Sequence, residues 1–335
     1  MTAWHTFKRR FLPPSPPEYP RPVGIVASMR AITYSEFGSA DVLELTEQPD
    51  PHIGPDTVVV RVRAASVNPV DWKVREGYLE GLIDTLLPAI PGWDVAGVVE
   101  QVGLDTPELE VGDEVYGYVR KDTVQGGTFA ELVAAPVRTL ARKPASLSFE
   151  EAAAVPLAGL TAYQVIQRAG VTAGQTVLVH AAAGGVGSFA AQIARALGAR
   201  VIGTASEKNH EFLRGLGAEP VTYGDGLADR VRALAPEGVD VALDLVGGDA
   251  VATSAGLLAD GGTIASITDA TARTEHGGHY VWVRPSTADL DALTALFDAG
   301  KLSVEVAQVF DLADAADAHR ASETGHTRGK VVVRV

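Results

Sequence analysis

Residues 175–206 constrain the fold more than any other stretch, because four predicted elements follow one another there in close succession. The apolar residues 176–179 predict a buried strand, 181–187 a turn of small residues, 188–197 a helix and 200–204 a second strand. Two parallel strands need a crossover connection, which is usually a helix. This stretch therefore predicts a βαβ unit inside a parallel sheet.

The turn of this unit matches the dinucleotide fingerprint G-x-G-x-x-G at two of its three glycines, since Gly184 and Gly187 hold the second and third places while Ala182 holds the first. The second glycine lets the backbone approach a pyrophosphate, and the third allows close packing of helix on sheet. The following helix offers free N–H groups to phosphates. We predict a nucleotide site, with a merely tight turn as the alternative. The expected contacts in the turn are Ala183, Gly184, Gly185, Val186 and Gly187.

Composition excludes several classes of protein. A length of 335 residues allows about two domains, and 46% hydrophobic with 21% charged residues describes a globular chain. The net charge of −14 argues against duplex nucleic acid or an anionic membrane surface as the main partner. No apolar run approaches the roughly 18 residues of a membrane span. The absence of cysteine removes disulfides and thiolate chemistry, and makes a cytoplasmic location the expectation.

The pattern divides the chain into four segments. Residues 1–28 carry six closely spaced prolines and no periodic apolar face, which predicts a flexible arm. Short β runs separated by Gly and Pro turns predict a β-rich domain over 29–150. Alternating strands and helices predict a parallel sheet over 151–285. Residues 286–335 read as two helices and a last strand that returns to the first domain.

Three local predictions are specific enough to be checked. Residues 66–77 break the β alternation around Pro69 and predict a rigid turn that aims side chains at a cleft. Residues 280–283 read as a strand. Residues 312–322 read as a helix with Asp311 as its N-cap.

Six motifs together resemble the medium-chain dehydrogenase/reductase superfamily, and within it the zinc-independent quinone oxidoreductases and alkenal or enone reductases. The resemblance covers residues 29–335, and it implies an α/β fold with a GroES-like β-rich catalytic domain and a Rossmann-type parallel-sheet cofactor domain. The motifs are VNPVDWKVREG at 67–77, PGWDVAGVVEQVG at 91–103, PLAGLTAY at 156–163, HAAAGGVG at 180–187, DLVGG at 244–248 and RGKVVV at 328–333.

The zinc alcohol dehydrogenases among these relatives place a cysteine ligand near the position of Asn68 and a Gly-His-Glu motif where this chain has Gly92, Trp93 and Asp94. Both the cysteine and the histidine are absent. A catalytic zinc needs about three protein ligands, and the pair His276 and His279 has no third partner in the sequence. We therefore predict that no metal is bound. Acceptors that take a hydride without a Lewis acid fit such a site better than alcohols.

The end of the second strand favours NADP(H) over NAD. An NAD site places an acidic residue about 20 positions after the first fingerprint residue, and residues 202–204 contain none. Ser206 and Lys208 follow, and the resemblance adds Tyr223 as a third contact for a 2′-phosphate. A solvated surface lysine is the alternative for Lys208, and Glu207 argues mildly against a purely cationic pocket.

The expected reaction is hydride transfer from NADPH to a quinone or to the β-carbon of an activated enone. Two alternatives stay open: an enoyl-thioester reductase of lipid or polyketide assembly, and a sensor that binds NADPH without catalysis. The resemblance places Asn68 and Thr161 at the nicotinamide end of the cofactor. Further contacts expected with the cofactor are Val246, Ile267 and Arg328.

Three polar side chains are the candidates for catalysis. Asn68 is expected to bond the cofactor ribose or the acceptor carbonyl, with a simple turn residue before Pro69 as the alternative. Lys73 and Tyr78 are the candidates to polarise a carbonyl or deliver a proton, and either one also reads as a surface side chain. Asp71 is expected to tie the loop to a backbone N–H or to Arg75 rather than to act as a base. No dedicated general acid emerges, so water is the expected proton source.

Aromatic residues supply candidate walls for a flat acceptor, although aromatics more often fill a core. These residues are Trp93, Tyr280 and Trp282. Trp282 and Val283 also fall near the far edge of the expected parallel sheet, where relatives pair edge to edge as dimers. An uncovered edge would favour a homodimer.

Overall fold

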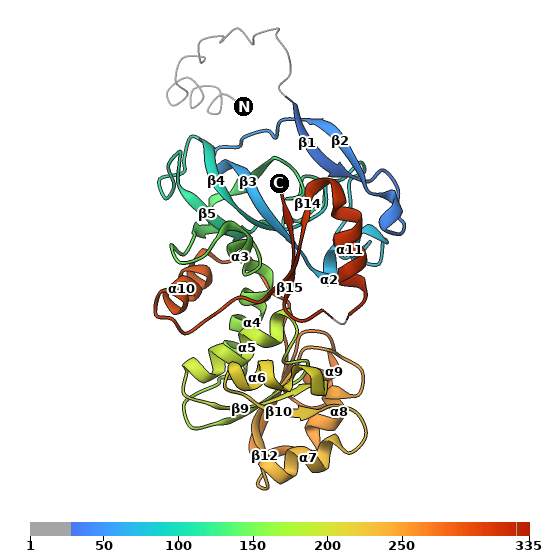
Figure 1. The fold of residues 1–335 in the computed structure, drawn as a ribbon, viewed down its shortest axis with the longest axis vertical. Coiled ribbons are helices and arrows are strands. Elements are labelled where there is room, and N and C mark those ends of the chain that lie inside the picture. The colour runs from blue at the N-terminus through green and yellow to red at the C-terminus, as the bar shows by residue number, and fades with distance from the viewer. Residues whose placement is uncertain (1–27, 326) are drawn as a thin grey trace, which may run out of the picture.

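A computed structural model describes residues 28–325 and 327–335, and it shows two parts stacked along the long axis of the molecule (Figure 1). The early strands and the C-terminal elements share one part, while the middle of the chain forms the other. The predicted arm, residues 1–28, lies outside the described residues except for Ser28, which already belongs to the first strand. On the basis of this arrangement, we propose that the chain divides into segments after residues 28, 150 and 285.

The first part is built on a seven-stranded sheet with the order β14-β15-β3-β4-β5-β7, while β6 pairs with β3. Burial alternates in the middle of β3, where Val60 and Val62 are buried while Arg61 and Arg63 are exposed, as expected for a sheet with one solvated face. The bounds are β3 (Thr57–Val67), β4 (Asp94–Val102), β5 (Glu114–Tyr118), β6 (Leu132–Pro136), β7 (Leu140–Arg142), β14 (Val306–Asp311) and β15 (Lys330–Arg334), with a separate pair β1 (Ser28–Thr33) and β2 (Glu44–Pro49).

The last strand returns to the first domain, as predicted. β15 pairs antiparallel with β3 from Val331 opposite Val67 to Arg334 opposite Ala64. β14 lies parallel to β15 on its other side. The C-terminal strands therefore close the sheet that the N-terminal half begins (Figure 1).

The second part is a six-stranded parallel sheet with the order β10-β9-β8-β11-β12-β13. This order reverses between β8 and β11, which is the crevice where doubly wound sheets bind nucleotides. Val177, Leu178 and Val179 are all fully buried because helices cover both faces of the sheet. The strands are β8 (Thr176–Val179), β9 (Arg200–Ala205), β10 (Glu219–Thr222), β11 (Val239–Asp244), β12 (Leu258–Ser266) and β13 (His279–Tyr280).

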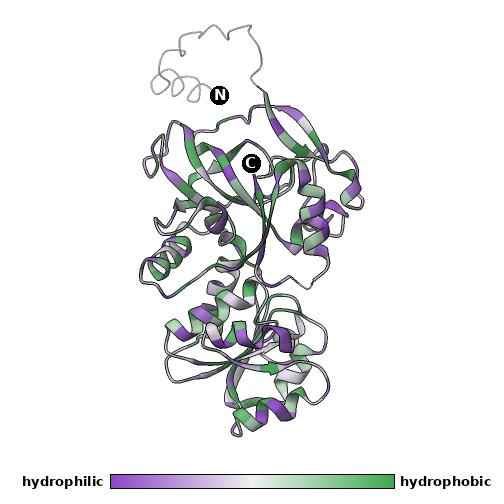
Figure 2. Cartoon of the chain, in the orientation of Figure 1, coloured by the Kyte–Doolittle hydropathy of each residue, from purple (hydrophilic) through white to green (hydrophobic). Residues whose placement is uncertain are grey.

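Helices around the parallel sheet carry hydrophobic residues inward and hydrophilic residues outward, and Figure 2 shows both kinds along them. Within the part of the chain that the structure describes, no helix combines the length and the apolarity that a membrane crossing requires. The α/β fold class predicted from the sequence is confirmed. These helices and turns are α5 (Gly185–Ala196), η3 (Glu207–Asn209), α6 (His210–Gly215), α7 (Leu227–Leu234), α8 (Ala250–Ala255) and α9 (Thr271–Thr274).

Two further helices join the parts. α4 (Pro156–Ala169) begins with a proline at its first position and ends at Gly170, whose φ of +69° suits a glycine C-cap. α10 (Thr287–Asp298) packs on α4, and Tyr116 of β5 donates a hydrogen bond of 2.7 Å to the Leu290 carbonyl. The two sheets therefore sit on a shared helical layer. The remaining short elements are η1 (Ala40–Val42), η2 (Val137–Thr139) and α3 (Phe149–Ala153).

The prediction of a turn over residues 66–77 is wrong, because most of this segment is the helix α2 (Pro69–Arg75). Pro69 occupies the first helical position, where its missing N–H costs nothing, and the Asn68 N–H donates to the Asp71 carboxylate at 2.7 Å. Proline and a polar N-cap were read as turn residues, whereas here they start a helix. The expected backbone contact of Asp71 is confirmed.

Two other local predictions need correction. The strand expected over 280–283 is only β13, so Trp282 and Val283 lie beyond its end. The segment over 312–322 begins as the 3₁₀ turn η4 (Leu312–Asp314) and continues as α11 (Ala315–Glu323), and Asp311 makes no side-chain cap bond.

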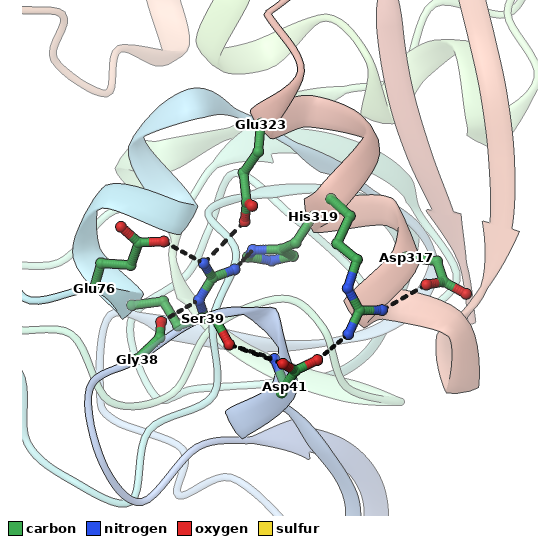
Figure 3. Close-up of polar contacts among 9 residues, drawn as sticks. Gly38, Ser39, Asp41, Glu76, Asp317, His319 and Glu323 are labelled. Atoms are coloured by element: carbon green, nitrogen blue, oxygen red, sulfur yellow. Dashed lines mark hydrogen bonds and ion pairs between the residues drawn. The ribbon is translucent and has the colours of Figure 1, made fainter.

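Arg75 of α2 is buried and contacts His319 and Glu323 of α11, both of which are labelled in Figure 3. The Arg75 side chain is fully buried, its Nε donates to the Gly38 carbonyl at 2.9 Å, and its Nη1 donates to His319 Nδ1 at 3.0 Å. Its Nη2 donates to the carboxylates of Glu76 and Glu323, each at 2.9 Å. Each guanidinium nitrogen has a partner, so this cluster fixes the helix that carries Lys73 and follows Asn68.

His319 is neutral in this cluster, because its Nδ1 accepts a hydrogen bond from Arg75 and a proton on that nitrogen would face the guanidinium. Burial and the Arg75 charge lower the pKa of His319 to about 3. The unfolded chain protonates this histidine below about pH 6.5, which is its ordinary value. The stability contributed by a neutral His319 is therefore present above about pH 6.5 and is lost as the pH falls toward 3.

We predict that His319→Gln, which keeps an acceptor for Arg75 but does not titrate, makes the free energy of unfolding less dependent on pH. Between about pH 6.5 and pH 4 the slope should fall by up to about 1.4 kcal/mol per pH unit. Urea unfolding followed by circular dichroism at several pH values measures it. Equal slopes for the variant and the wild type would contradict the neutral assignment of His319.

Candidate active site

Two adjoining cavities lie at the carboxyl edge of the parallel sheet, beside the turn after β8. The first encloses about 860 Å³ and the second about 630 Å³. They join at the fingerprint turn, because Ala181, Gly184 and Val246 line both. The first is lined mainly by the parallel-sheet part, while the second also takes residues from α2, Val67 of β3 and Tyr118 of β5. One long binding space therefore runs from the nucleotide fold to the catalytic domain.

The turn itself differs from the prediction in where the helix begins. α5 starts at Gly185 rather than Ser188, so the glycines of the fingerprint already form the helix N-terminus. Ala181 has a φ of +51°, which is a strained conformation for a residue with a side chain. Its N–H donates to Thr204 Oγ1 at 3.0 Å, and the N–H of Ala182 donates to the Thr204 carbonyl at 2.9 Å. Thr204 of β9 thus holds the strained turn.

The two fingerprint glycines have different reasons to lack a side chain. A Cβ on Gly187 would lie 2.2 Å from the Ala181 carbonyl oxygen, so helix and turn could not pack. A Cβ on Gly184 would meet only that same oxygen, at 3.3 Å, because its other side faces the cavities. Open backbone at a helix N-terminus is a cradle for phosphate. These residues fit a dinucleotide.

The first cavity contains the three residues expected at a 2′-phosphate. Ser206, Lys208 and Tyr223 all line it, and Lys208 is exposed. Arg230 donates to the Thr222 carbonyl at 2.7 Å and so anchors the loop that carries Tyr223. Lys208 is the only lysine or arginine among the described residues that line this cavity. Three carboxylates line it as well: Asp225, Asp229 and Asp249.

The second cavity brings together most of the other predicted residues. Asn68, Lys73, Thr161, Val246 and Ile267 line it. The aromatic residues predicted as walls line it as well: Trp93, Tyr280 and Trp282. Its lining therefore combines a flat apolar surface with an amide and two lysine side chains, Lys73 and Lys330.

Two predicted residues do not reach either cavity. Tyr78 is 67% exposed beyond the end of α2 and packs edge-on against Trp72. Arg328 pairs with Glu305 at 2.9 Å and lies over the ring of Phe212. The sequence could not show where these two side chains lie. The position of Tyr78 depends on the direction in which α2 ends, and that of Arg328 depends on a contact with Glu305, which is distant in the chain.

A buried polar network surrounds Asn68. Its Nδ2 donates to Asp94 Oδ2 at 2.8 Å, and its Oδ1 accepts a short hydrogen bond from the Lys330 ammonium. Asp94 also accepts from Ser66 Oγ and from the Leu157 N–H, each at 2.8 Å. Both ends of the Asn68 amide are therefore held by the protein. The contact of Lys330 with this network was not predicted from the sequence. The one available signal was a lysine at the start of an apolar strand.

Burial dominates the electrostatics of this network. It raises the pKa of Asp94, and the charge of Lys330 opposes that rise. It lowers the pKa of Lys330, and Asp94 and Asp71 oppose that fall. Burial also raises the pKa of Asp71 to about 7, although its hydrogen bond from Asn68 acts in the other direction. Two carboxyls and one ammonium thus share a region with little water.

The donor set of this region does not fit a catalytic zinc. Asn68 offers an amide that is already bonded at both ends, and Trp93 offers no ligand atom. The sequence has no cysteine. Residues 28–325 and 327–335 contain no group of three or more histidine, cysteine or acidic residues able to hold a metal ion. No step of the chemistry is therefore assigned to a metal.

The parallel sheet, the glycine cradle and the cavity between two domains define a nucleotide-dependent oxidoreductase. Residues 54–145 match the family described as "Alcohol dehydrogenase GroES-like domain", and residues 216–333 match the family described as "Zinc-binding dehydrogenase". The chain belongs to the medium-chain dehydrogenase/reductase superfamily.

Its relatives include reductases of activated double bonds and of quinones. The chain is 36% identical to a 2-methylene-furan-3-one reductase of Solanum lycopersicum, over 93% of this chain and 80% of that one. It is also 36% identical to an NADPH-dependent alkenal/one oxidoreductase, chloroplastic, of Arabidopsis thaliana, over 92% and 80%. The solved structure of a quinone oxidoreductase from Coxiella burnetii matches with a TM-score of 0.81 and 36% identity, over 92% of this chain and all of that one.

We predict that alanine at the two fingerprint glycines affects different properties of the protein. Gly187→Ala should lower the melting temperature of the cofactor-free protein, because its Cβ would collide with the Ala181 backbone. Gly184→Ala should leave that temperature nearly unchanged but weaken NADPH binding by about tenfold or more, because the new methyl group fills the phosphate cradle. Thermal unfolding without cofactor and fluorescence titration with NADPH measure the two effects. Equal loss of melting temperature in both variants would contradict the distinction.

Proposed function

We propose that this protein is a zinc-independent, NADPH-dependent oxidoreductase that transfers a hydride to a quinone or to an α,β-unsaturated carbonyl compound. The observation that carries the proposal is the pair of adjoining cavities, with Ser206 and Lys208 at one end and, at the other, an aromatic-walled cavity whose described lining residues include no histidine, cysteine or carboxylate. The names of the relatives support both acceptor classes.

Residues of both cavities would contact NADPH. The turn over residues 183–187 would hold the pyrophosphate at the start of α5 through N–H groups other than that of Gly184, which donates to the Ala181 carbonyl at 3.0 Å. Ser206, Lys208 and Tyr223 would hold the 2′-phosphate, with Lys208 providing the charge. Bound NADPH supplies the hydride, and the protein positions and shields it. Thr161, Val246 and Ile267 line the end of the space where the nicotinamide would lie.

The acceptor end explains the choice of substrate class. Trp93, Tyr280 and Trp282 provide flat apolar walls suited to a conjugated ring or chain. Asn68 is held rigid and would fix the orientation of the ribose or the acceptor carbonyl, while Lys73 reaches the same cavity from α2. Quinones and enones accept a hydride at a carbon that is already electrophilic. They do not depend on the metal that alcohol oxidation uses.

We further propose that the protein works as a cytoplasmic homodimer. The absence of cysteine fits a compartment that does not oxidise thiols. β13 is the last strand of the parallel sheet, and Trp282 beside it is 41% exposed, which suits pairing with a second copy. The net charge of −14 keeps nucleic acid and anionic membranes out of the proposed partners.

Rapid mixing of the enzyme and NADPH with a panel of quinones, enals and enones tests the activity directly. We expect the absorbance of the reduced nicotinamide to fall in a substrate-dependent manner that survives dialysis against a chelator. Binding of NADPH without oxidation by any member of the panel would instead favour a sensor. Oxidation only with enoyl thioesters would favour the lipid or polyketide alternative.

We predict that Ser206→Ala combined with Lys208→Ala raises the KM for NADPH by about ten- to hundredfold, because charge-assisted hydrogen bonds to the phosphate are lost. The KM for NADH should change by less than about threefold, since NADH lacks the phosphate. Steady-state kinetics with both cofactors measures the two values. Equal increases for the two cofactors would contradict this assignment.

A further inference from the structure

Lys330 places a buried ammonium group beside the second cavity. Lys330 is the first residue of β15. Its side chain passes so close to the start of α5 that a Cβ on Gly185 would lie 2.8 Å from Lys330 Cδ. The ammonium then reaches the Asn68 amide oxygen and the Val67 carbonyl, the latter at 3.1 Å. The side chain is only 6% exposed, and it lines the second cavity.

The hydrogen bonds of this ammonium are incomplete within the described residues. An ammonium has three N–H donors, and two of them go to Asn68 and Val67. Asp94 is the next acceptor, with its Oδ2 at 3.9 Å, which is too long for a hydrogen bond. One donor of a buried cation therefore remains for a ligand in the cavity that it lines.

A purely structural role explains this geometry poorly. A lysine that serves only to neutralise a buried carboxylate normally contacts it at about 2.7–2.9 Å. Asp94 instead takes its hydrogen bonds from Ser66, Asn68 and Leu157. Burial lowers the pKa of Lys330, whereas the carboxyl groups of Asp94 and Asp71 raise it. These two carboxyl groups therefore favour the charged ammonium form of Lys330.

We propose that Lys330 is the positively charged group of the acceptor site: it holds the Asn68 amide in place and stabilises the oxygen that becomes negative when the acceptor is reduced. The proposal rests on the proposed function. Hydride addition at the β-carbon breaks the conjugated C=C π bond and moves the carbonyl π pair to oxygen, giving an enolate. A quinone gives the corresponding ring enolate, which becomes the hydroquinone once the proton on the former β-carbon is lost to water and the oxygens are protonated. The free N–H of Lys330 stabilises that anion, and water then supplies the proton. Lys330 replaces a Lewis acid by charge alone.

Lys330→Met tests the proposal, because it removes the charge but keeps the length of the side chain. Since this change leaves Asp94 without its neighbouring cation, Lys330→Met combined with Asp94→Asn provides a second variant without the unbalanced charge. Lys301→Met is the matched control, because Lys301 is an exposed lysine outside both cavities. Thermal unfolding and NADPH titration check that each variant folds and binds the cofactor.

We expect the double variant to fold and to bind NADPH within about threefold of the wild type, while its kcat with the best quinone or enone falls by about a hundredfold, as when one oxyanion donor is removed. The KM for the acceptor should change much less than kcat, because the interaction forms only as charge develops. A well-folded double variant with kcat within about threefold of the wild type would overturn the proposal and leave Lys330 as a counter-ion of Asp94.

A second readout does not depend on turnover. 4-Nitrophenol is a flat phenol whose anion mimics the charged oxygen, and its phenolate absorbance band reports the ionised form. With NADP⁺ present, we expect the wild type and Lys301→Met to lower the pH at which bound 4-nitrophenol ionises, and both Lys330 variants to lose this shift. A shift that persists in the folded Lys330 variants overturns the assignment. A shift that depends on Lys330 in an enzyme that reduces no acceptor supports the anion site and refutes the proposed function instead.

Discussion

The contact between the fingerprint turn and the returning C-terminal strand determines where the site can form. Gly184 and Gly329 form a parallel bridge, and the Gly329 N–H donates to the Ala183 carbonyl at 3.3 Å. The next residue, Lys330, extends from this bridge to Asn68 in the other domain. One strand thus joins the cofactor cradle to the acceptor cavity, so the two halves of the binding space are fixed relative to each other.

One strained residue and a pair of buried charges lie close to this junction. Ala181 adopts a left-handed conformation that costs roughly 1–2 kcal/mol, and Thr204 holds it there. Asp94 and Lys330 are buried charges with opposite shifts in pKa. Neither feature is needed to build a parallel sheet or a β-rich domain. Such costs persist in proteins where they position groups for function, which agrees with a site at this point.

The sequence predicted what depends on local pattern and missed what depends on distant contacts. Apolar periodicity and small residues identified the βαβ unit, the glycine cradle and the strand that returns to the first domain. The helix after Asn68 was misread because Pro69 and a polar N-cap occur in turns as well as at helix starts. Arg328 was assigned to the cofactor because its pairing with Glu305 cannot be read from spacing. The role of Lys330 could not be predicted, because a lysine at the start of an apolar strand does not indicate a contact with Asn68, which is distant in the chain.

We propose that this cavity delivers the hydride of NADPH to an electrophilic carbon without a metal. The most direct measurement uses NADPH carrying deuterium at the transferable position of the nicotinamide, an α,β-unsaturated ketone, and enzyme dialysed against a chelator. Mass spectrometry and NMR of the product locate the label. We expect one deuterium at the β-carbon. Product without deuterium, or transfer that appears only when zinc is restored, would contradict it.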